Sequence, residues 1–251
     1  MYTPSCVLIT GATGDFGKAF AHKFAEMGCS LILNGRDPEK LKALAAQFST
    51  PTHTICFDIN DAPAMTKAVE NLPSEFAAID LLINNAGGAH GLDKFQDADQ
   101  QDLDLMIESN VMGLVRMTRL VIDGMVKHQK GHVINIGSVA GNWPYPRGHV
   151  YCAVKAFVRQ FSLALRADMV GTKVRVTNIE PGMVETQFSL TRFKGDKEKA
   201  DAVYANTTPL QANDIAETVA WCACQPPHVN INTLEIMPTV QSFAGLSVER
   251  F

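Results

Sequence analysis

Residues 10–17 read TGATGDFG, and this turn decides how the rest of the chain is interpreted. The apolar run CVLI at 6–9 precedes it, and KAFAHKFAEMG at 18–28, with helical spacing of its apolar residues, follows it. The pattern predicts a strand, a glycine-rich turn and a helix over 17–28. Backbone N–H groups of such a turn can approach a pyrophosphate at the helix N-terminus, although similar turns also occur without a ligand.

The glycines of this turn allow two spacings. Gly11, Gly14 and Gly17 give G-x-x-G-x-x-G, whereas G-x-x-x-G-x-G fits if Asp15 replaces its middle glycine. A carboxylate beside a diphosphate costs Coulomb energy, but Asp tolerates left-handed backbone angles and can cap the helix with its side chain turned away. Phosphate binding uses main-chain donors, which Asp15 still supplies. We therefore expect the whole turn at the cofactor: Gly11, Ala12, Thr13, Gly14, Asp15, Phe16 and Gly17.

Size and charge narrow the class of protein. The 251 residues fit one large α/β domain, and a net charge of −4 gives no electrostatic argument for binding nucleic acid or an anionic membrane. Apolar runs such as HVINIGSVA (132–140) are too short to span a bilayer, and no secretory signal is visible. We expect neither nucleic acid nor membrane as a partner.

The cysteines favour a reducing compartment. Six are scattered along the chain, and Cys222 and Cys224 form a C-x-C pair inside an apolar run. Metal binding would need a second ligand pair of suitable spacing, which the sequence does not offer. We expect buried reduced thiols, no metal and a cytoplasmic protein.

Apolar runs alternate with helical segments along the chain. Strands are expected at 5–10, 30–35, 52–58, 78–87, 131–138 and 172–182, with a possible seventh at 232–238. A helix follows Asp37, a plausible N-cap before Pro38, and a long helical segment spans 99–128. Continuous apolar strands between helices predict a single-domain, Rossmann-like, doubly wound parallel sheet whose ligands lie outside the carboxyl ends of the strands. The single domain would span 1–251, with a dinucleotide-binding half at about 1–135 and a catalytic and substrate half at about 136–251.

The end of the second predicted strand favours NADP over NAD. An NAD site usually offers a carboxylate here, whereas Arg accommodates a 2′-phosphate. Arg36 occupies this region, and its guanidinium can bind a phosphate with two parallel hydrogen bonds. Asp37 follows directly, but its position before Pro38 gives it a capping role. A solvated surface arginine is the alternative interpretation of Arg36.

Tyr151 and Lys155 form the candidate catalytic pair. They lie four residues apart in the helical stretch 151–171, so the phenol and the ammonium share one helix face. A neighbouring cation lowers the pKa of a tyrosine toward the working range of a proton carrier. Ser138 ends the strand 131–138 at the same edge of the sheet, where its hydroxyl can bond a substrate carbonyl.

Taken together, these motifs resemble the short-chain dehydrogenase/reductase family over nearly the whole chain. The matching residues are TG-x-x-x-G-x-G except at 15, NNAG at 84–87, ESNVMG at 108–113, Ser138, Tyr151-x-x-x-Lys155 and PG at 181–182. A length of 251 and the NNAG motif match the short branch of the family rather than the longer, sugar-nucleotide-modifying branch. Asp15 then stands for the middle glycine of the turn.

The resemblance implies a role for each matching residue. Tyr151 would exchange the alcohol proton, Lys155 would lower the Tyr151 pKa and bond the nicotinamide ribose, and Ser138 would position the substrate oxygen. Asn110 would hold a water in a proton relay, although a polar residue that bends a helix is the alternative. Further cofactor contacts are implied for Asp58, Ile59, Asn85, Ala86, Gly87, Pro181, Gly182 and Val184.

Segments outside these motifs resemble a narrower group, the NADP-dependent 3-hydroxy acid dehydrogenases. They include GNWPY (141–145), RFKGD (192–196) and HVNINTLEIMPTVQSFAGL (228–246). The implied substrates are L-serine, L-allo-threonine and the 3-hydroxypropionate class with its semialdehyde. A sulfoacetaldehyde reductase that forms isethionate is the alternative, and a non-catalytic dinucleotide-binding sensor is an alternative of another class.

A small anionic substrate requires a cation in the site. Arg192 is the first candidate and Arg147 the second, because either can bind a carboxylate or sulfonate, although each also fits a solvated loop. Trp143 and Tyr145 are expected in a pocket wall or a subunit contact. The family resemblance implies a homotetramer, and the apolar tail at 232–251 could lie between subunits.

Overall fold

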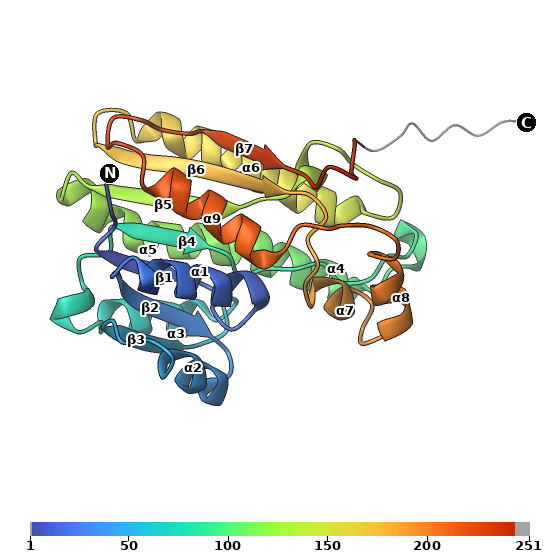
Figure 1. Ribbon diagram of the computed structural model, residues 1–251, viewed down its shortest axis with the longest axis horizontal. Helices are drawn as coiled ribbons and strands as arrows, with labels where there is room; N and C mark the ends of the chain where they lie inside the picture. The colour runs from blue at the N-terminus through green and yellow to red at the C-terminus, as the bar shows by residue number, and fades with distance from the viewer. Residues whose placement is uncertain (1, 244–251) are drawn as a thin grey trace, which may run out of the picture.

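Seven parallel strands form one sheet in the computed structural model, which describes residues 2–243 (Figure 1). Their order is β3-β2-β1-β4-β5-β6-β7, which reverses direction between β1 and β4. The strands are β1 (Cys6–Ile9), β2 (Ser30–Gly35), β3 (Thr52–Cys56), β4 (Leu81–Asn84), β5 (Gly131–Ile136), β6 (Val174–Pro181) and β7 (Thr233–Ile236). All seven predicted strands, including the possible seventh, are confirmed.

Helices cover both faces of the sheet because the strands carry apolar side chains on both faces. Val7 and Ile9 of β1 pack into one core, and Cys6 and Leu8 pack into the other. The first face carries α1 (Asp15–Glu26), α2 (Pro38–Ala45) and α9 (Ala212–Ala223). The second carries α3 (Ala62–Glu70), α5 (Leu114–Lys127) and α6 (His149–Asp168), with α4 (Gln100–Ile107) packed against α6. The predicted doubly wound architecture is confirmed.

Two short helices, α7 (Phe188–Arg192) and α8 (Lys197–Ala202), lie beyond the carboxyl ends of the strands (Figure 1). Both belong to the connection between β6 and α9. Because ligands of such sheets lie at this edge, α7 and α8 are placed to cover a bound substrate. Three short 3₁₀ segments complete the described chain: η1 (Ser74–Phe76), η2 (Phe95–Asp97) and η4 (Val139–Gly141).

The predicted helical segment 99–128 is interrupted. Asp99 caps α4 by accepting a hydrogen bond from the Gln101 N–H, and α4 then continues through a π-helical turn, η3 (Glu108–Gly113), into α5. A π-turn carries one extra residue and often marks a functional site. Asn110 lies inside this turn. Its position is compatible with both interpretations from the sequence, a polar residue that bends a helix and a residue that holds a water.

The cysteines are free thiols, and all except Cys56 are buried. Burial raises the pKa of Cys222 to about 12, which keeps this thiol protonated and chemically inert. Residues 2–243 contain no cluster of three or more His, Cys, Asp or Glu side chains placed to hold a metal ion. Within the same range, no helix combines the length and the hydropathy needed to cross a membrane. Most of the tail 232–251 is described, but its last part, 244–251, lies outside the described residues.

Candidate active site

The glycine turn has the geometry of a phosphate-binding loop. Gly11 adopts a φ of +62°, and a Cβ on Gly17 would lie 2.3 Å from the Gly11 carbonyl oxygen, so only glycine fits at 17. Gly14 is the N-cap of α1 and no side chain caps this helix, which leaves its first N–H groups free for an anion. The turn therefore fits the pyrophosphate of a dinucleotide.

Asp15 does not cap α1, contrary to the sequence prediction, because α1 begins at Asp15 itself and Gly14 takes the capping position. The carboxylate of Asp15 instead accepts a 2.6 Å hydrogen bond from the backbone N–H of Gln187, just before α7. The carboxylate is therefore bonded on the side of α7.

Three polar side chains hold the turn in place. Thr10 Oγ1 accepts hydrogen bonds from the N–H groups of Asn85 and Ala86, both at 2.9 Å. Asn85 Nδ2 donates to the carbonyls of Thr10 and Gly11, so this side chain supports the turn. Asn34 is buried in β2 and receives a 3.4 Å bond from the Gly11 N–H. Sequence analysis missed Thr10 and Asn34, although each is a polar residue inside an apolar strand run.

The end of β2, where the 2′-phosphate is expected, is open to solvent. The Arg36 side chain is 77 % exposed and makes only a 3.5 Å ion pair with Asp58. Asp37 caps α2 through bonds from the Glu39 and Lys40 N–H groups, as predicted, and the bond from Lys40 lowers the pKa of its carboxyl. Because Asp37 is engaged in capping and the ion pair with Asp58 is exposed, the Arg36 guanidinium is accessible to a phosphate. Ile59 is buried against Gly113 of η3.

The predicted catalytic residues meet where β5 ends. Tyr151 and Lys155 are both buried on α6, at 8 % and 9 % exposure, and Lys155 Nζ lies 5.8 Å from the centroid of the Tyr151 ring. Lys155 Nζ donates to the Ile136 carbonyl at 3.0 Å, which joins α6 to the end of β5. Gly141 lets η4 approach α6 closely, since a Cβ there would lie 2.8 Å from the Lys155 backbone. This contact brings Ser138, the N-cap of η4, beside Tyr151.

Burial is the largest influence on the pKa of both members of the pair. Burial raises the pKa of Tyr151, while the nearby Ser138 hydroxyl and the Arg192 charge lower it. Burial also lowers the pKa of Lys155 to about 8, because a charged ammonium loses hydration there. Arg192 is thus a second cation close to the phenol, in addition to Lys155, whose Nζ lies 5.8 Å from the ring centroid. The effect of Lys155 on the pKa of Tyr151 stays a prediction.

Asn110 is held in the π-turn with its side-chain oxygen unpaired among the described residues. Its Nδ2 donates to the carbonyls of Gly88 and Met106, both at 2.9 Å. Its Oδ1 is buried and has no hydrogen-bond partner within residues 2–243. A buried acceptor without a partner is a suitable site for an ordered water. Gly87, with a φ of +146°, is required here because a Cβ would lie 2.5 Å from this oxygen.

The two candidate substrate cations occupy different environments. Arg192, at the end of α7, has its Cζ 5.6 Å from the centroid of the Tyr151 ring, and its NH1 donates to Tyr145 Oη at 2.8 Å. Its Nε donates to the Gly91 carbonyl at 3.2 Å. Arg147 is exposed, and no hydrogen bond or ion pair joins it to another of the residues 2–243. The structure brings Arg192 to the catalytic residues and leaves Arg147 at the surface.

The α7 segment also contributes an apolar wall. The ring of Phe188 packs on Tyr151 with centroids 5.6 Å apart, and Tyr145 lies on the other side of Arg192. Tyr145 therefore contacts the candidate substrate cation, whereas Trp143 is exposed and packs on Phe243. Phe188 was missed because nothing in its local sequence distinguishes it from a core phenylalanine.

Pro181 and Gly182 end β6 where the nicotinamide is expected. Gly182 donates to the Ile236 carbonyl, and a Cβ on it would lie 2.3 Å from Gln241 Oε1. That same oxygen accepts a 2.7 Å bond from the Met183 N–H. Val184 pairs with Leu210 in an isolated bridge. Gln241, which the sequence analysis did not single out, thus fixes the backbone at this end of the site.

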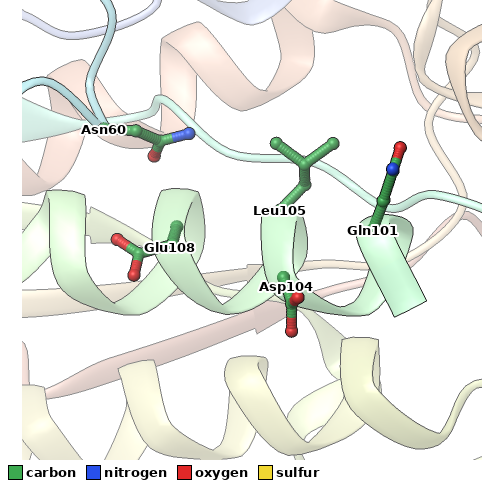
Figure 2. Close-up of a pocket in the computed structure, with 5 residues that line it drawn as sticks. All are labelled: Asn60, Gln101, Asp104, Leu105 and Glu108. Atoms are coloured by element: carbon green, nitrogen blue, oxygen red, sulfur yellow. The ribbon is translucent and has the colours of Figure 1, made fainter.

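A separate hollow lies on the outer face of α4 (Figure 2). None of the predicted catalytic residues lines it; its walls are Asn60, Gln101, Asp104, Leu105 and Glu108. The candidate active site is therefore defined by the convergence of catalytic side chains at the sheet edge, and not by this hollow.

A glycine turn, a serine at a strand end and a Tyr–Lys pair at the carboxyl edge of a parallel sheet define a dinucleotide-dependent oxidoreductase. The family described as short chain dehydrogenase matches residues 5–197, and the chain belongs to that family. NADP-dependent 3-hydroxy acid dehydrogenase YdfG of Salmonella typhi is 52% identical over 245 residues, covering 97% of this chain and 99% of the relative. Sulfoacetaldehyde reductase 2 of Chromohalobacter salexigens is 47% identical over 247 residues, covering 97% and 98%.

A solved structure agrees at the level of the whole fold. The closed form of serine dehydrogenase complexed with NADP+ is 48% identical, covers 98% of this chain and 100% of its own, and superposes with a TM-score of 0.96. The predicted membership of the short-chain dehydrogenase/reductase family is thereby confirmed. The predicted similarity to the 3-hydroxy acid dehydrogenases is confirmed as well.

Proposed function

We propose that this chain transfers hydride between NADP(H) and a small anionic 3-hydroxy acid or its semialdehyde. The observation that carries the proposal is the position of Arg192, whose guanidinium lies over the Tyr151 ring at the same sheet edge as Ser138 and Lys155. An anion held by Arg192 would present its alcohol to the phenol. The relatives named for 3-hydroxy acid and serine dehydrogenation support this substrate class.

The cofactor assignment follows from the two ends of its site. The first N–H groups of α1 fit the pyrophosphate, and the exposed Arg36 fits a 2′-phosphate. When bound, the nicotinamide of NADP supplies the hydride acceptor for oxidation, and NADPH supplies the donor for reduction. Lys155, which donates to the Ile136 carbonyl, would bond the nicotinamide ribose, and Pro181, Gly182 and Val184 would flank the carboxamide.

Side chains of this protein would carry the proton between the substrate and solvent. In oxidation, the Tyr151 phenolate accepts the proton of the 3-hydroxyl while Ser138 hydrogen-bonds the same oxygen. In reduction, the Tyr151 phenol returns that proton. Lys155 and a water held at Asn110 Oδ1 would pass it on to solvent. Arg192 holds the substrate anion and favours the phenolate that accepts the proton.

A second substrate class is favoured by one relative. Sulfoacetaldehyde also carries a carbonyl near an anionic group, and a sulfonate fits a guanidinium as a carboxylate does. Side-by-side kinetics with NADPH and either malonic semialdehyde or sulfoacetaldehyde separates the two. A higher kcat/KM for malonic semialdehyde, together with NADP reduction by L-serine, supports the proposed function. A higher kcat/KM for sulfoacetaldehyde assigns the chain to the alternative.

The same assay tests a non-catalytic sensor. Ser138, Tyr151 and Lys155 are all present and assembled, which argues for turnover. If NADPH absorbance changes with none of L-serine, other 3-hydroxy acids or sulfoacetaldehyde, the sensor gains support.

The proposed assembly is a homotetramer in the cytoplasm. Large apolar side chains are exposed on α4, η3 and α6, where a second copy would bury them: Leu105, Ile107, Met112 and Phe157. The free thiols support a reducing compartment. Light scattering after size exclusion gives the oligomeric state directly.

A further inference from the structure

Asp15 joins two parts of the site that are far apart in the sequence. Its Oδ2 accepts a 2.6 Å hydrogen bond from the Gln187 N–H, across 172 positions of the chain. Asp15 is the first residue of α1, directly after the phosphate-binding turn, and Gln187 is the N-cap of α7. The bond therefore connects the cofactor turn to the helix that covers the catalytic tyrosine.

The helix α7 is held at both of its ends. At the Asp15 end, Phe188 packs on Tyr151. At the other end, Gly91 and Arg192 exchange two hydrogen bonds, one from the Gly91 N–H at 3.0 Å and one from Arg192 Nε at 3.2 Å. Releasing either end would let the side chains on α7 move away from the phenol.

We propose that Asp15 is a positioning residue that holds α7 over the site and couples its closure to the phosphate-binding turn. Glycine, which the family motif places at this position, has no acceptor for the Gln187 N–H, whereas a carboxylate forms a charge-assisted bond. A dinucleotide bound at the turn would therefore contact the same segment that anchors α7. The part of the proposal that concerns the dinucleotide depends on the proposed function.

Three variants isolate the bond. Asp15→Ala removes the acceptor, and Asp15→Asn keeps an acceptor oxygen but removes the charge. Gln187→Pro removes the donor, and the φ of −63° at Gln187 suits proline. If both positions act through one bond, the effects of Asp15→Ala and Gln187→Pro do not add in the double variant.

Hydrogen exchange of the cofactor-free protein is the direct readout. The Thr191 and Phe193 N–H groups, which bond to the Gln187 and Ser189 carbonyls, report on α7. We expect about fivefold faster exchange in Asp15→Ala, in Gln187→Pro and in the double variant, as for the loss of one hydrogen bond. Asp15→Asn keeps a weaker, neutral bond and should exchange at a rate between those of the original chain and Asp15→Ala. Unchanged circular dichroism shows that each variant is folded.

Three results would overturn the proposal. Exchange in Asp15→Ala could equal that of the original chain, or the effects of the two single variants could multiply in the double variant. Asp15→Asn could also exchange as fast as Asp15→Ala, which would assign the effect to charge at the α1 N-terminus.

Stopped-flow release of NADPH tests the coupling without any organic substrate. Asp15→Ala should release NADPH about fivefold faster, whereas an unchanged release rate contradicts the coupling. If the original chain binds no NADPH, the proposed function fails, while hydrogen exchange still tests whether Asp15 holds α7.

Discussion

The guanidinium of Arg192 lies over the ring of Tyr151, with Cζ 5.6 Å from the ring centroid, although the two residues belong to different helices. Burial raises the pKa of Tyr151, and the Arg192 charge lowers it. One side chain thus combines two roles, since the cation that can hold the substrate anion also favours the phenolate. Closure of α7 would therefore assemble the substrate site and activate the proton acceptor together.

Replacing Arg192 tests both roles, because substrate binding is read from KM and the effect on the phenol from the pH profile. Arg192→Met should raise KM for the anionic substrate about 10- to 100-fold, because a charge-assisted bond to the carboxylate is lost. It should also shift the pH at which oxidation reaches half its maximum kcat upward by about one pH unit, because the phenolate loses a nearby cation. In Arg192→Lys, the pH at which oxidation reaches half its maximum kcat should stay close to that of the original chain, while KM rises.

The matched control for this experiment is Arg147→Met. Arg147 is exposed, so its replacement should leave both KM and the pH profile within about twofold. A large KM increase in Arg147→Met with no effect in Arg192→Met would reverse the assignment of the substrate cation.

Gly17→Ala tests the phosphate-binding turn. A Cβ at 17 would lie 2.3 Å from the Gly11 carbonyl oxygen, so the turn must shift to admit it. We expect NADPH affinity to fall at least about tenfold, as backbone donors lose their alignment with the pyrophosphate. Fluorescence titration with NADPH measures this, and undiminished affinity would show that the turn does not hold the cofactor.

Gly141→Ala tests the contact between η4 and α6. The added Cβ would lie 2.8 Å from the Lys155 backbone and should move Ser138 away from Tyr151, lowering kcat about tenfold or more. Gly124→Ala is the matched control, because no atom lies within 4 Å of its Cβ position in α5, and it should raise the melting temperature slightly. Equal activities in the two variants would contradict the role of this contact.

Lys155 should reduce stability at neutral pH. Burial lowers its pKa from 10.5 to about 8, so the cost of the buried charge is present in full below pH 8 and is relieved as the pH rises toward 10.5. A shift of this size corresponds to about 3 kcal/mol. Lys155→Met should therefore melt at a higher temperature than the original chain at pH 7, while its activity is lost. Thermal melts at pH 7 and pH 10 should show this gap narrowing; a gap that widens would contradict the pKa direction.

The fold was predictable because its signals are local. Each strand is a short apolar run, and Asp37 before Pro38 marked the start of α2. Helix α1 starts two residues before its prediction, since its N-cap is Gly14, which has no side chain to reveal it. The π-turn at 108–113 was not predicted either, because its apolar spacing resembles that of the flanking α-helices.

The chemistry of the site was predictable only in part. The sequence revealed Tyr151 and Lys155 because a spacing of four residues places both on one helix face. It revealed Ser138 because this residue ends a predicted strand at the ligand-binding edge of the sheet. The pKa of Tyr151 depends on its burial and on Arg192, which reaches it through the tertiary fold. The Asp15–Gln187 bond has the same origin, as it joins residues 172 positions apart.

The proton carrier is tested most directly by Tyr151→Phe, assayed for NADPH binding and for turnover with L-serine and malonic semialdehyde. The loss of the hydroxyl should reduce kcat by about 10²- to 10⁴-fold in both directions, while the dissociation constant for NADPH stays within about twofold. Turnover comparable to that of the original chain would contradict the assignment of Tyr151 as the group that exchanges the substrate proton.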